Sequence, residues 1–260
     1  MKNQDFLKDC VYQNKIKNVM LFYGITFVLL ASIFLIYFLF DSLFEYSPIF
    51  FQAVLLFFAT NLLGMFYIKK EKYKKIYGED AYVKAFFRFH VTAMPFIYMS
   101  TIHPAFTNYS SFLQDFPQFF SSPYYWIHIA IGGYLLLSGL LLHPKVIKTF
   151  GFDNLFMYYV YFPEKGEKNE SPVYGMMRHP LYSAMARIAL GLGILRGTVD
   201  SICVGAIIPL CQFFWLAVYE EPDLIKRFGE EYKKYQKSVW AIFVKPKYVA
   251  KFWKYLILGS

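Results

Sequence analysis

The residues best suited to chemistry lie at one end of a predicted helical hairpin. One apolar stretch opens with the RHPLY segment at residues 178–182, and a second closes with Glu220-Glu221. Residues 181–197 carry Arg187 and Arg196 as their only charges, residues 201–219 carry none, and three residues separate these two ranges. Helices joined by so short a link must run antiparallel. A guanidinium, an imidazole, a phenol and two carboxylates are therefore predicted to meet, and such groups beside apolar helices usually mark a site.

Composition indicates that these helices belong to a membrane protein. Of the 260 residues, 57% are apolar and 22% aromatic, which exceeds the usual composition of a soluble domain. Because about 20 apolar residues cross a bilayer core, we predict an all-α polytopic integral membrane protein with about six transmembrane helices. The predicted spans are residues 19–40, 48–68, 86–106, 124–142, 181–197 and 201–219. The third span contains Arg88, so an interfacial or re-entrant helix is its alternative.

The distribution of charge supports six crossings. Nearly all of the 27 lysines and arginines fall before the first span, in segments 69–88 and 145–178, or after residue 225. The alternate loops, 41–47 and 107–123, contain none. The positive-inside rule then predicts both termini and the RHPLY segment on the cytoplasmic-type side. The net charge of +9 is thus a topology signal, and no nucleic-acid partner is expected. Endoplasmic reticulum, inner mitochondrial and bacterial plasma membranes all remain open.

The chain divides, on this interpretation, into two regions. Residues 1–145 hold the first four transmembrane helices, and residues 146–260 hold the hairpin and the C-terminal helices. Apolar residues recur at spacings of three and four from Ile225 to Val239, with charges on the other face, which predicts an amphipathic interfacial helix. A second interfacial run is predicted at residues 248–258.

The C-terminal motifs carry a family resemblance. Tyr174 stands four residues before the RHPLY segment, and Glu220-Glu221 is followed by FGxxYxxY beginning at Phe228. This order resembles the membrane methyltransferases, the family of isoprenylcysteine carboxyl methyltransferases and phospholipid methyltransferases. The resemblance covers residues 174–246. It implies S-adenosylmethionine as cofactor at the cytoplasmic end, with a lipid-like acceptor entering from the bilayer.

The resemblance also implies roles for the site residues. The expected cofactor-binding residues are Tyr174, Arg178, His179, Tyr182, Glu220 and Glu221, with Arg178 and His179 also assigned as catalytic. A guanidinium suits the cofactor carboxylate, and either glutamate suits its ammonium or ribose hydroxyls. The Tyr182 ring suits the adenine or the sulfonium. Methyl transfer would then depend mostly on positioning, and no metal is expected.

Several residues depart from the family pattern. Pro172, Gly175 and Ala184 replace residues that are usual there, and Ala184 is expected to narrow a cofactor cleft. Arg187, inside the first hairpin helix, suits either an acceptor phosphate or a carboxylate of a neighbouring helix. Two alternatives to the methyltransferase therefore stay open. One is a catalytically inactive structural subunit of a larger membrane complex, such as a mitochondrial one, and the other is an NADPH-dependent sterol-type reductase. An open pocket at the motif residues would favour an enzyme.

Overall fold

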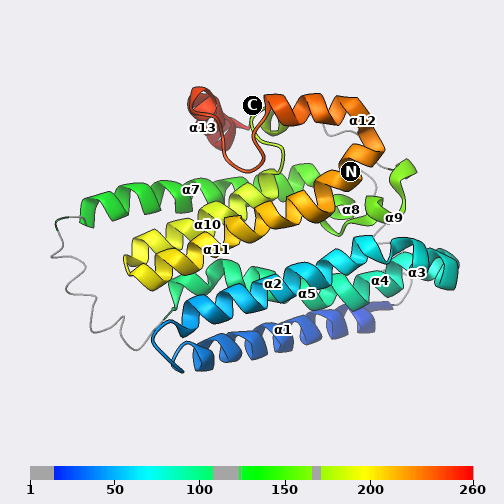
Figure 1. Cartoon of the computed structure of the whole chain (residues 1–260), viewed down its shortest axis with the longest axis horizontal. Helices are drawn as coiled ribbons and strands as arrows, with labels where there is room; N and C mark the ends of the chain where they lie inside the picture. The colour runs from blue at the N-terminus through cyan, green and yellow to red at the C-terminus, as the bar shows by residue number, and fades with distance from the viewer. Residues whose placement is uncertain (1–14, 108–122, 124, 166–170, 260) are drawn as a thin grey trace.

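The computed structural model describes residues 15–107, 123, 125–165 and 171–259, and its regular elements in these ranges are all helical (Figure 1). The predicted all-α class is confirmed for this part of the chain. The α-helices are α1 (Lys15–Phe40), α2 (Ser47–Ile68), α3 (Lys70–Tyr77), α4 (Ala81–Ala85), α5 (Val91–Ile102), α7 (Tyr125–Phe150), α8 (Phe152–Leu155), α9 (Tyr158–Tyr161), α10 (Pro180–Arg196), α11 (Val199–Trp215), α12 (Glu221–Ser238) and α13 (Val249–Leu258).

Short turns of other helix types connect these elements. The π-helical segments η4 (Phe86–His90) and η8 (Leu216–Glu220) join α4 to α5 and α11 to α12, so each pair continues without a break. Turns of 3₁₀ type include η7 (Pro172–Gly175), which precedes α10, and η9 (Pro246–Tyr248), which precedes α13. The π segment η8 ends at Glu220 and thus belongs to the predicted site.

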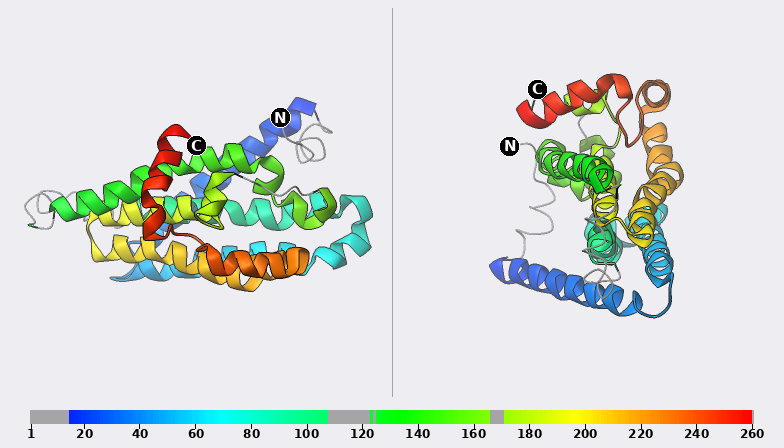
Figure 2. Two further views of the ribbon diagram at one scale, coloured as in Figure 1. Left: turned by 90° about the horizontal axis from the view of Figure 1, so that it is seen from above. Right: turned by 90° about the vertical axis from the view of Figure 1, so that its left-hand side faces the viewer.

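The long helices lie side by side and form two layers with α1 outside them (Figures 1 and 2). Helix α10 packs against α7 and α11, while α2 packs against α5 and α11. Helix α1 contacts α5 and α2. Between the layers, Leu56 of α2 shares a buried cluster with Ala189 of α10 and Ile208 of α11. The two helices of the hairpin are therefore positioned by different partners, α10 by α7 and α11 by α2.

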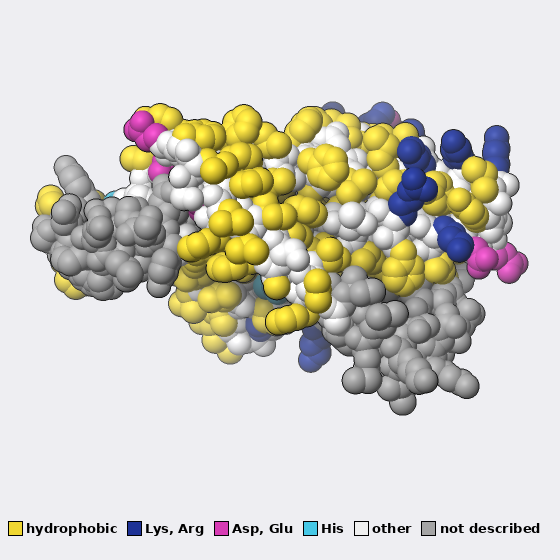
Figure 3. All heavy atoms as spheres, turned by 90° about the horizontal axis from the view of Figure 1, so that it is seen from below, with side chains coloured by type: hydrophobic (Ala, Val, Ile, Leu, Met, Phe, Trp, Pro, Cys, Tyr) yellow, Lys and Arg dark blue, Asp and Glu magenta, His cyan; other side chains and the backbone are white. Residues whose placement is uncertain are grey.

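Within the described residues, three helical stretches are long and apolar enough to cross a membrane: Ser47–Ile68, Tyr125–Phe150 and the continuous Val199–Ser238. A shorter apolar stretch occupies Phe27–Phe40. Figure 3 shows a mainly hydrophobic face along the helices, with Lys and Arg gathered toward one end. These features support a membrane protein. The count of six spans and the sidedness of the termini stay predictions, as does the division at residue 145.

The α10–α11 hairpin has local reasons for its tight turn. Gly197 ends α10 with φ 78°, a left-handed conformation that favours glycine. Thr198 caps α11, and its Oγ1 accepts a hydrogen bond from the Ser201 backbone N–H at 3.2 Å. The antiparallel hairpin predicted from the three-residue link is thus present.

Because the two helices of the hairpin are in close contact, a larger side chain at Gly193 is expected to destabilise the folded protein. A Cβ added to Gly193 would lie 2.4 Å from the Ser201 carbonyl oxygen of α11. Gly193→Val is expected to lower the free energy of unfolding by about 1–3 kcal/mol, because the helices must separate. Thermal melting in detergent would measure this. Gly133→Val on α7, where an added Cβ meets nothing within 4 Å, is the matched control. Equal melting temperatures for both variants would contradict the packing.

Beyond the hairpin, the chain folds back over the end that carries the RHPLY segment. The predicted amphipathic helix is present as α12, which bends where Gly229 adopts φ 57°. After α12 the chain passes alongside residues 178 and 179 and ends in α13 (Figure 1). Helix α13 packs on α7. The C-terminal segment thereby covers the predicted site.

Candidate functional site

The RHPLY segment is held in place by a distant part of the chain. The backbone N–H of Arg178 donates to the Trp240 carbonyl at 2.9 Å, and that of His179 to the Ala241 carbonyl at 2.8 Å. Pro180 then starts α10, a position where its missing N–H costs nothing. The side chains of Arg178 and His179 thus start from a fixed turn just before α10.

His179 lies between the carboxylates of Glu220 and Glu221. Its Nδ1 lies 3.2 Å from Glu220 Oε1, and its Nε2 lies 3.1 Å from Glu221 Oε1. Both ring nitrogens can donate only in the protonated imidazole. The geometry therefore suits an imidazolium bridging two carboxylates, and the predicted meeting of these groups is confirmed as an arrangement.

The pKa values of His179 and Glu221 agree with this pairing. Burial alone would lower the pKa of His179, but hydrogen bonds and charge from Glu220 and Glu221 outweigh it and raise the pKa. Burial alone would raise the pKa of Glu221, which lies beyond the uncharged stretch, but His179 and Arg178 lower it to about 2. At neutral pH, Glu221 is therefore ionised and His179 is shifted toward its charged form.

Arg178 is committed to protein groups. Its Nε and Nη2 donate to Glu221 Oε1 at 2.9 and 2.7 Å. Its Nη1 donates to the carbonyls of Gln236, at 3.0 Å, and Val239. These contacts use nearly all of the guanidinium's N–H donors. Arg178 thus holds Glu221 and the end of α12 in place, a positioning role in addition to any contact with a ligand.

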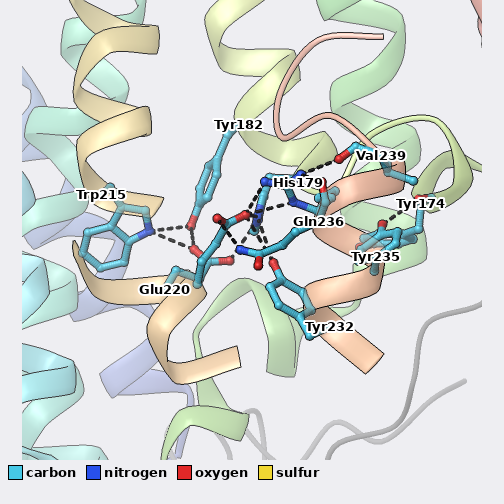
Figure 4. Close-up of polar contacts among 11 residues, drawn as sticks. Tyr174, His179, Tyr182, Trp215, Glu220, Tyr232, Tyr235, Gln236 and Val239 are labelled. Carbon is cyan, nitrogen blue, oxygen red and sulfur yellow. Dashed lines mark hydrogen bonds and ion pairs between the residues drawn. The ribbon is translucent and has the colours of Figure 1, made fainter. Parts of the chain in front are cut away.

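Tyr182 belongs to a second set of hydrogen bonds around Glu220. Its hydroxyl donates to Glu220 Oε2, and Trp215 Nε1 donates to the same oxygen at 2.8 Å and to the Tyr182 hydroxyl at 3.0 Å. The Tyr182 ring stacks beside the His179 imidazole, with centroids 5.7 Å apart and planes at 17°. Glu220 is thus oriented by three side chains, all visible in Figure 4.

Among the predicted cofactor-binding residues, Tyr174 has a side-chain hydroxyl that is available for a hydrogen bond. Its carbonyl accepts a hydrogen bond from the Tyr235 hydroxyl at 2.5 Å. Its own hydroxyl is buried and has no partner among the described residues. Since buried hydroxyls are nearly always paired, the Tyr174 hydroxyl is a candidate ligand contact.

A cavity of about 570 Å³ opens beside these residues. Tyr174, Arg178, His179, Tyr182 and Glu220 line it, whereas Glu221 is not among the lining residues that the structure describes. From this polar end the cavity extends between the two helix layers to residues of α2, α5 and α11. Its apolar walls include Leu56, Leu63, Met94, Ile97, Met185 and Ile208.

Several residues of the site were not predicted from the sequence. Trp215 lies in an uncharged stretch, and nothing in the sequence indicated its role. It contacts Glu220 because the π segment η8 brings residues five apart onto the same side of the helix. Gln236, whose Nε2 donates to Glu221 Oε2 at 2.9 Å, was one polar residue of an amphipathic helix. Asp223 and Arg227 also line the cavity. Their spacing of four residues on α12 was the available signal.

Two expectations for α10 need correction. Ala184 does not narrow the cavity, because it is fully buried against α7 residues such as Leu142 and Val146. Arg187 does not line the cavity and has no carboxylate within 4.0 Å among the described residues. Instead it donates to Ser183 and Ser138 at 3.2 and 3.1 Å, and its guanidinium lies 4.7 Å from the Phe252 ring centroid. Arg187 therefore ties α7 and α13 to α10.

The raised pKa of His179 predicts a pH-dependent contribution to stability. A raised pKa stabilises the folded state below the ordinary value of 6.5, and this contribution is lost as pH rises through the raised value. The difference in melting temperature between wild type and His179→Gln should thus shrink as pH increases above 6.5. Glu221 adds no slope there, because its contribution is lost only as pH falls from 4.5 toward about 2. A constant difference across the alkaline range would contradict the bridging imidazolium.

Comparison with known proteins agrees with this geometry. Residues 127–231 match the family model of phospholipid methyltransferase, a range that takes in α7, the RHPLY segment, the hairpin and much of α12. No curated protein and no solved structure matched the chain. The resemblance to the membrane methyltransferases that was predicted for the C-terminal half is confirmed over this range.

Proposed function

We propose that the protein is an integral membrane methyltransferase that transfers a methyl group from S-adenosylmethionine to a lipid-like acceptor. The cavity is the observation that carries the proposal. It joins a polar end, formed by His179, Glu220 and Tyr174, to an apolar end between α2, α5 and α11. A charged cofactor and an apolar acceptor need these two environments side by side.

The residues at the polar end fit the cofactor. A volume of about 570 Å³ lies within the range of about 300–1,000 Å³ usual for ligand sites. Glu220, Asp223 and Glu231 supply carboxylates for an ammonium group or ribose hydroxyls. Tyr174 supplies a hydroxyl with no partner among the described residues. The cavity thus offers acceptors and a donor where such a ligand needs them.

Arg227 is better placed than Arg178 to bind the cofactor carboxylate. Arg178 is engaged by Glu221 and two backbone carbonyls. Arg227 also lines the cavity, and its nearest carboxylate oxygen among the described residues, on Asp223, is 4.0 Å away, beyond hydrogen-bonding distance. Its guanidinium lies 5.1 Å from the Phe228 ring centroid, which fixes its orientation. We therefore assign carboxylate binding to Arg227 and a positioning role to Arg178.

The protein's contribution to methyl transfer is positioning and exclusion of water. Bound S-adenosylmethionine supplies an electrophilic methyl group on a sulfonium. Tyr182 presents a fixed aromatic face to the cavity, because Glu220 and Trp215 hold its hydroxyl, and such a face favours a cation. The apolar walls keep water from the reacting atoms. Orientation of this kind supplies much of the acceleration in displacement reactions.

The two alternatives account for the cavity less well. A structural subunit needs no open space beside these polar residues, and side chains would be expected to fill it. A reductase must hold the phosphates of NADPH, yet the cavity lining carries three carboxylates, Glu220, Asp223 and Glu231, and its cations, Arg178, Arg227 and the imidazolium of His179, do not outnumber them. The lining therefore offers no excess of positive charge for the phosphates.

A transfer assay with a matched pair of variants tests the proposal. Detergent-purified protein would be incubated with methyl-labelled S-adenosylmethionine and a membrane lipid extract, and label in the lipid phase would be measured. We expect label with wild type and with Lys226→Met, whose side chain is exposed. Arg227→Met should reduce transfer at low cofactor concentration by roughly 10- to 100-fold, the value of a charge-assisted hydrogen bond. Absence of label in all three folded proteins would refute the proposed function.

A further inference from the structure

Gln212 is a polar side chain without a described partner in the apolar part of the cavity. It lies on α11, within residues 201–219, which carry no charge. Its Oε1 is buried and accepts no hydrogen bond from a described residue. A buried polar group in an apolar, membrane-spanning stretch is unfavourable unless it is hydrogen-bonded. The side chain lines the cavity, so a ligand there can supply the missing partner.

The depth of Gln212 relative to the polar end is set by the helix. Ile208, Cys211, Gln212 and Trp215 share one face of α11 at spacings of three and four, and all line the cavity. Gln212 precedes Glu220 by eight residues, three in α11 and five in the π segment η8, so it lies deeper along the helix than the polar end. Thr60 of α2 also lines the cavity, but its hydroxyl is engaged, since Oγ1 donates to the Leu56 carbonyl at 2.7 Å. The amide is therefore left for a ligand.

We propose that Gln212 is a specificity-determining residue, and that the acceptor is a long apolar molecule with an internal hydroxyl or amide. This inference rests on the proposed function and names the class of acceptor within it. A primary amide both donates and accepts, so a hydroxyl or a secondary amide satisfies it fully. An unsubstituted hydrocarbon chain leaves it unpaired. Because Gln212 lies deeper along α11 than the polar end, the polar group of the acceptor is expected inside its chain and not at its reacting end.

A site built to hydrogen-bond its substrate rejects the analogue that lacks the polar group, because the protein group is then unpaired. The preference arises in binding and needs no cofactor. It can thus be measured separately from methyl transfer, on the full chain in detergent.

The test compares two fatty acids, stearate and a stearate with one mid-chain hydroxyl, by quenching of tryptophan fluorescence. Wild type is expected to bind the hydroxylated probe roughly 5- to 10-fold more tightly. Gln212→Leu, which keeps the volume and removes the amide, should bind both probes equally. Met185→Leu, another cavity residue, is the matched control and should keep the preference.

Each outcome bears on the inference. Equal affinities in wild type, a preference that survives in Gln212→Leu, or failure of both probes to bind would overturn it. A preference in a protein that neither binds nor uses S-adenosylmethionine would refute the proposed function and leave the Gln212 contact standing. Methyl transfer by a protein that binds both fatty acids equally would support the proposed function and refute the role of Gln212.

Discussion

Arg178→Ala is expected to lower the free energy of unfolding by about 3–5 kcal/mol, the usual effect of breaking a buried ion pair. The substitution removes two hydrogen bonds to Glu221 and two to the carbonyls of Gln236 and Val239. The side chains of Arg178 and Glu221 are only 10% and 13% exposed, so water replaces these bonds poorly. Denaturation in detergent, followed by tryptophan fluorescence, would measure the change.

A double-mutant cycle assigns this loss to the pair. Glu221→Gln and the double variant with Arg178→Ala complete the cycle, and we expect a coupling free energy above about 1 kcal/mol. Lys234→Ala on the exposed face of α12 is the control and should be nearly neutral. If Arg178→Ala were as stable as this control, Arg178 would not hold α12, and its assignment as a positioning residue would be wrong.

Glu220→Gln is expected to weaken binding of S-adenosylmethionine by roughly 10- to 100-fold, because a neutral amide lacks the negative charge that strengthens a hydrogen bond from the ammonium group. The carboxylate is oriented by Tyr182, Trp215 and His179 and lines the cavity. Isothermal titration calorimetry would measure the affinity.

The control for this loss is Glu230→Gln, which removes an exposed carboxylate of α12 that pairs with Lys233. It should leave the affinity unchanged. A similar affinity in wild type and Glu220→Gln would exclude Glu220 from cofactor binding. A fall that Glu230→Gln shares would assign the effect to overall charge.

Much of the site was predictable because it depends on local rules. The short link between the two apolar stretches forces the chain to return. In the structure Gly197 and Thr198 join α10 to α11, and the antiparallel return brings Glu220 and Glu221 back to His179. The amphipathic spacing from residue 225 likewise predicted α12. These features need no knowledge of contacts between distant segments.

The remainder depends on long-range packing that spacing does not encode. Trp240 and Ala241 pair with the RHPLY segment through their backbone carbonyls, which a residue of any type provides. The π segment η8 rotates Trp215 onto Glu220, although α-helical spacing would not pair residues five apart. Arg178 was expected to face a cofactor carboxylate. The carbonyls of Gln236 and Val239, reached only through the fold of α12, compete for the same donors.

The central claim is that the polar end of the cavity is a site for S-adenosylmethionine. Its most direct test is calorimetric titration of the detergent-purified protein with S-adenosylmethionine and, separately, with NADPH. We predict saturable binding of S-adenosylmethionine that Glu220→Gln weakens, with no binding of NADPH. Binding of NADPH alone would favour the reductase. Binding of neither ligand by a protein that still melts cooperatively would contradict the account and favour a structural subunit.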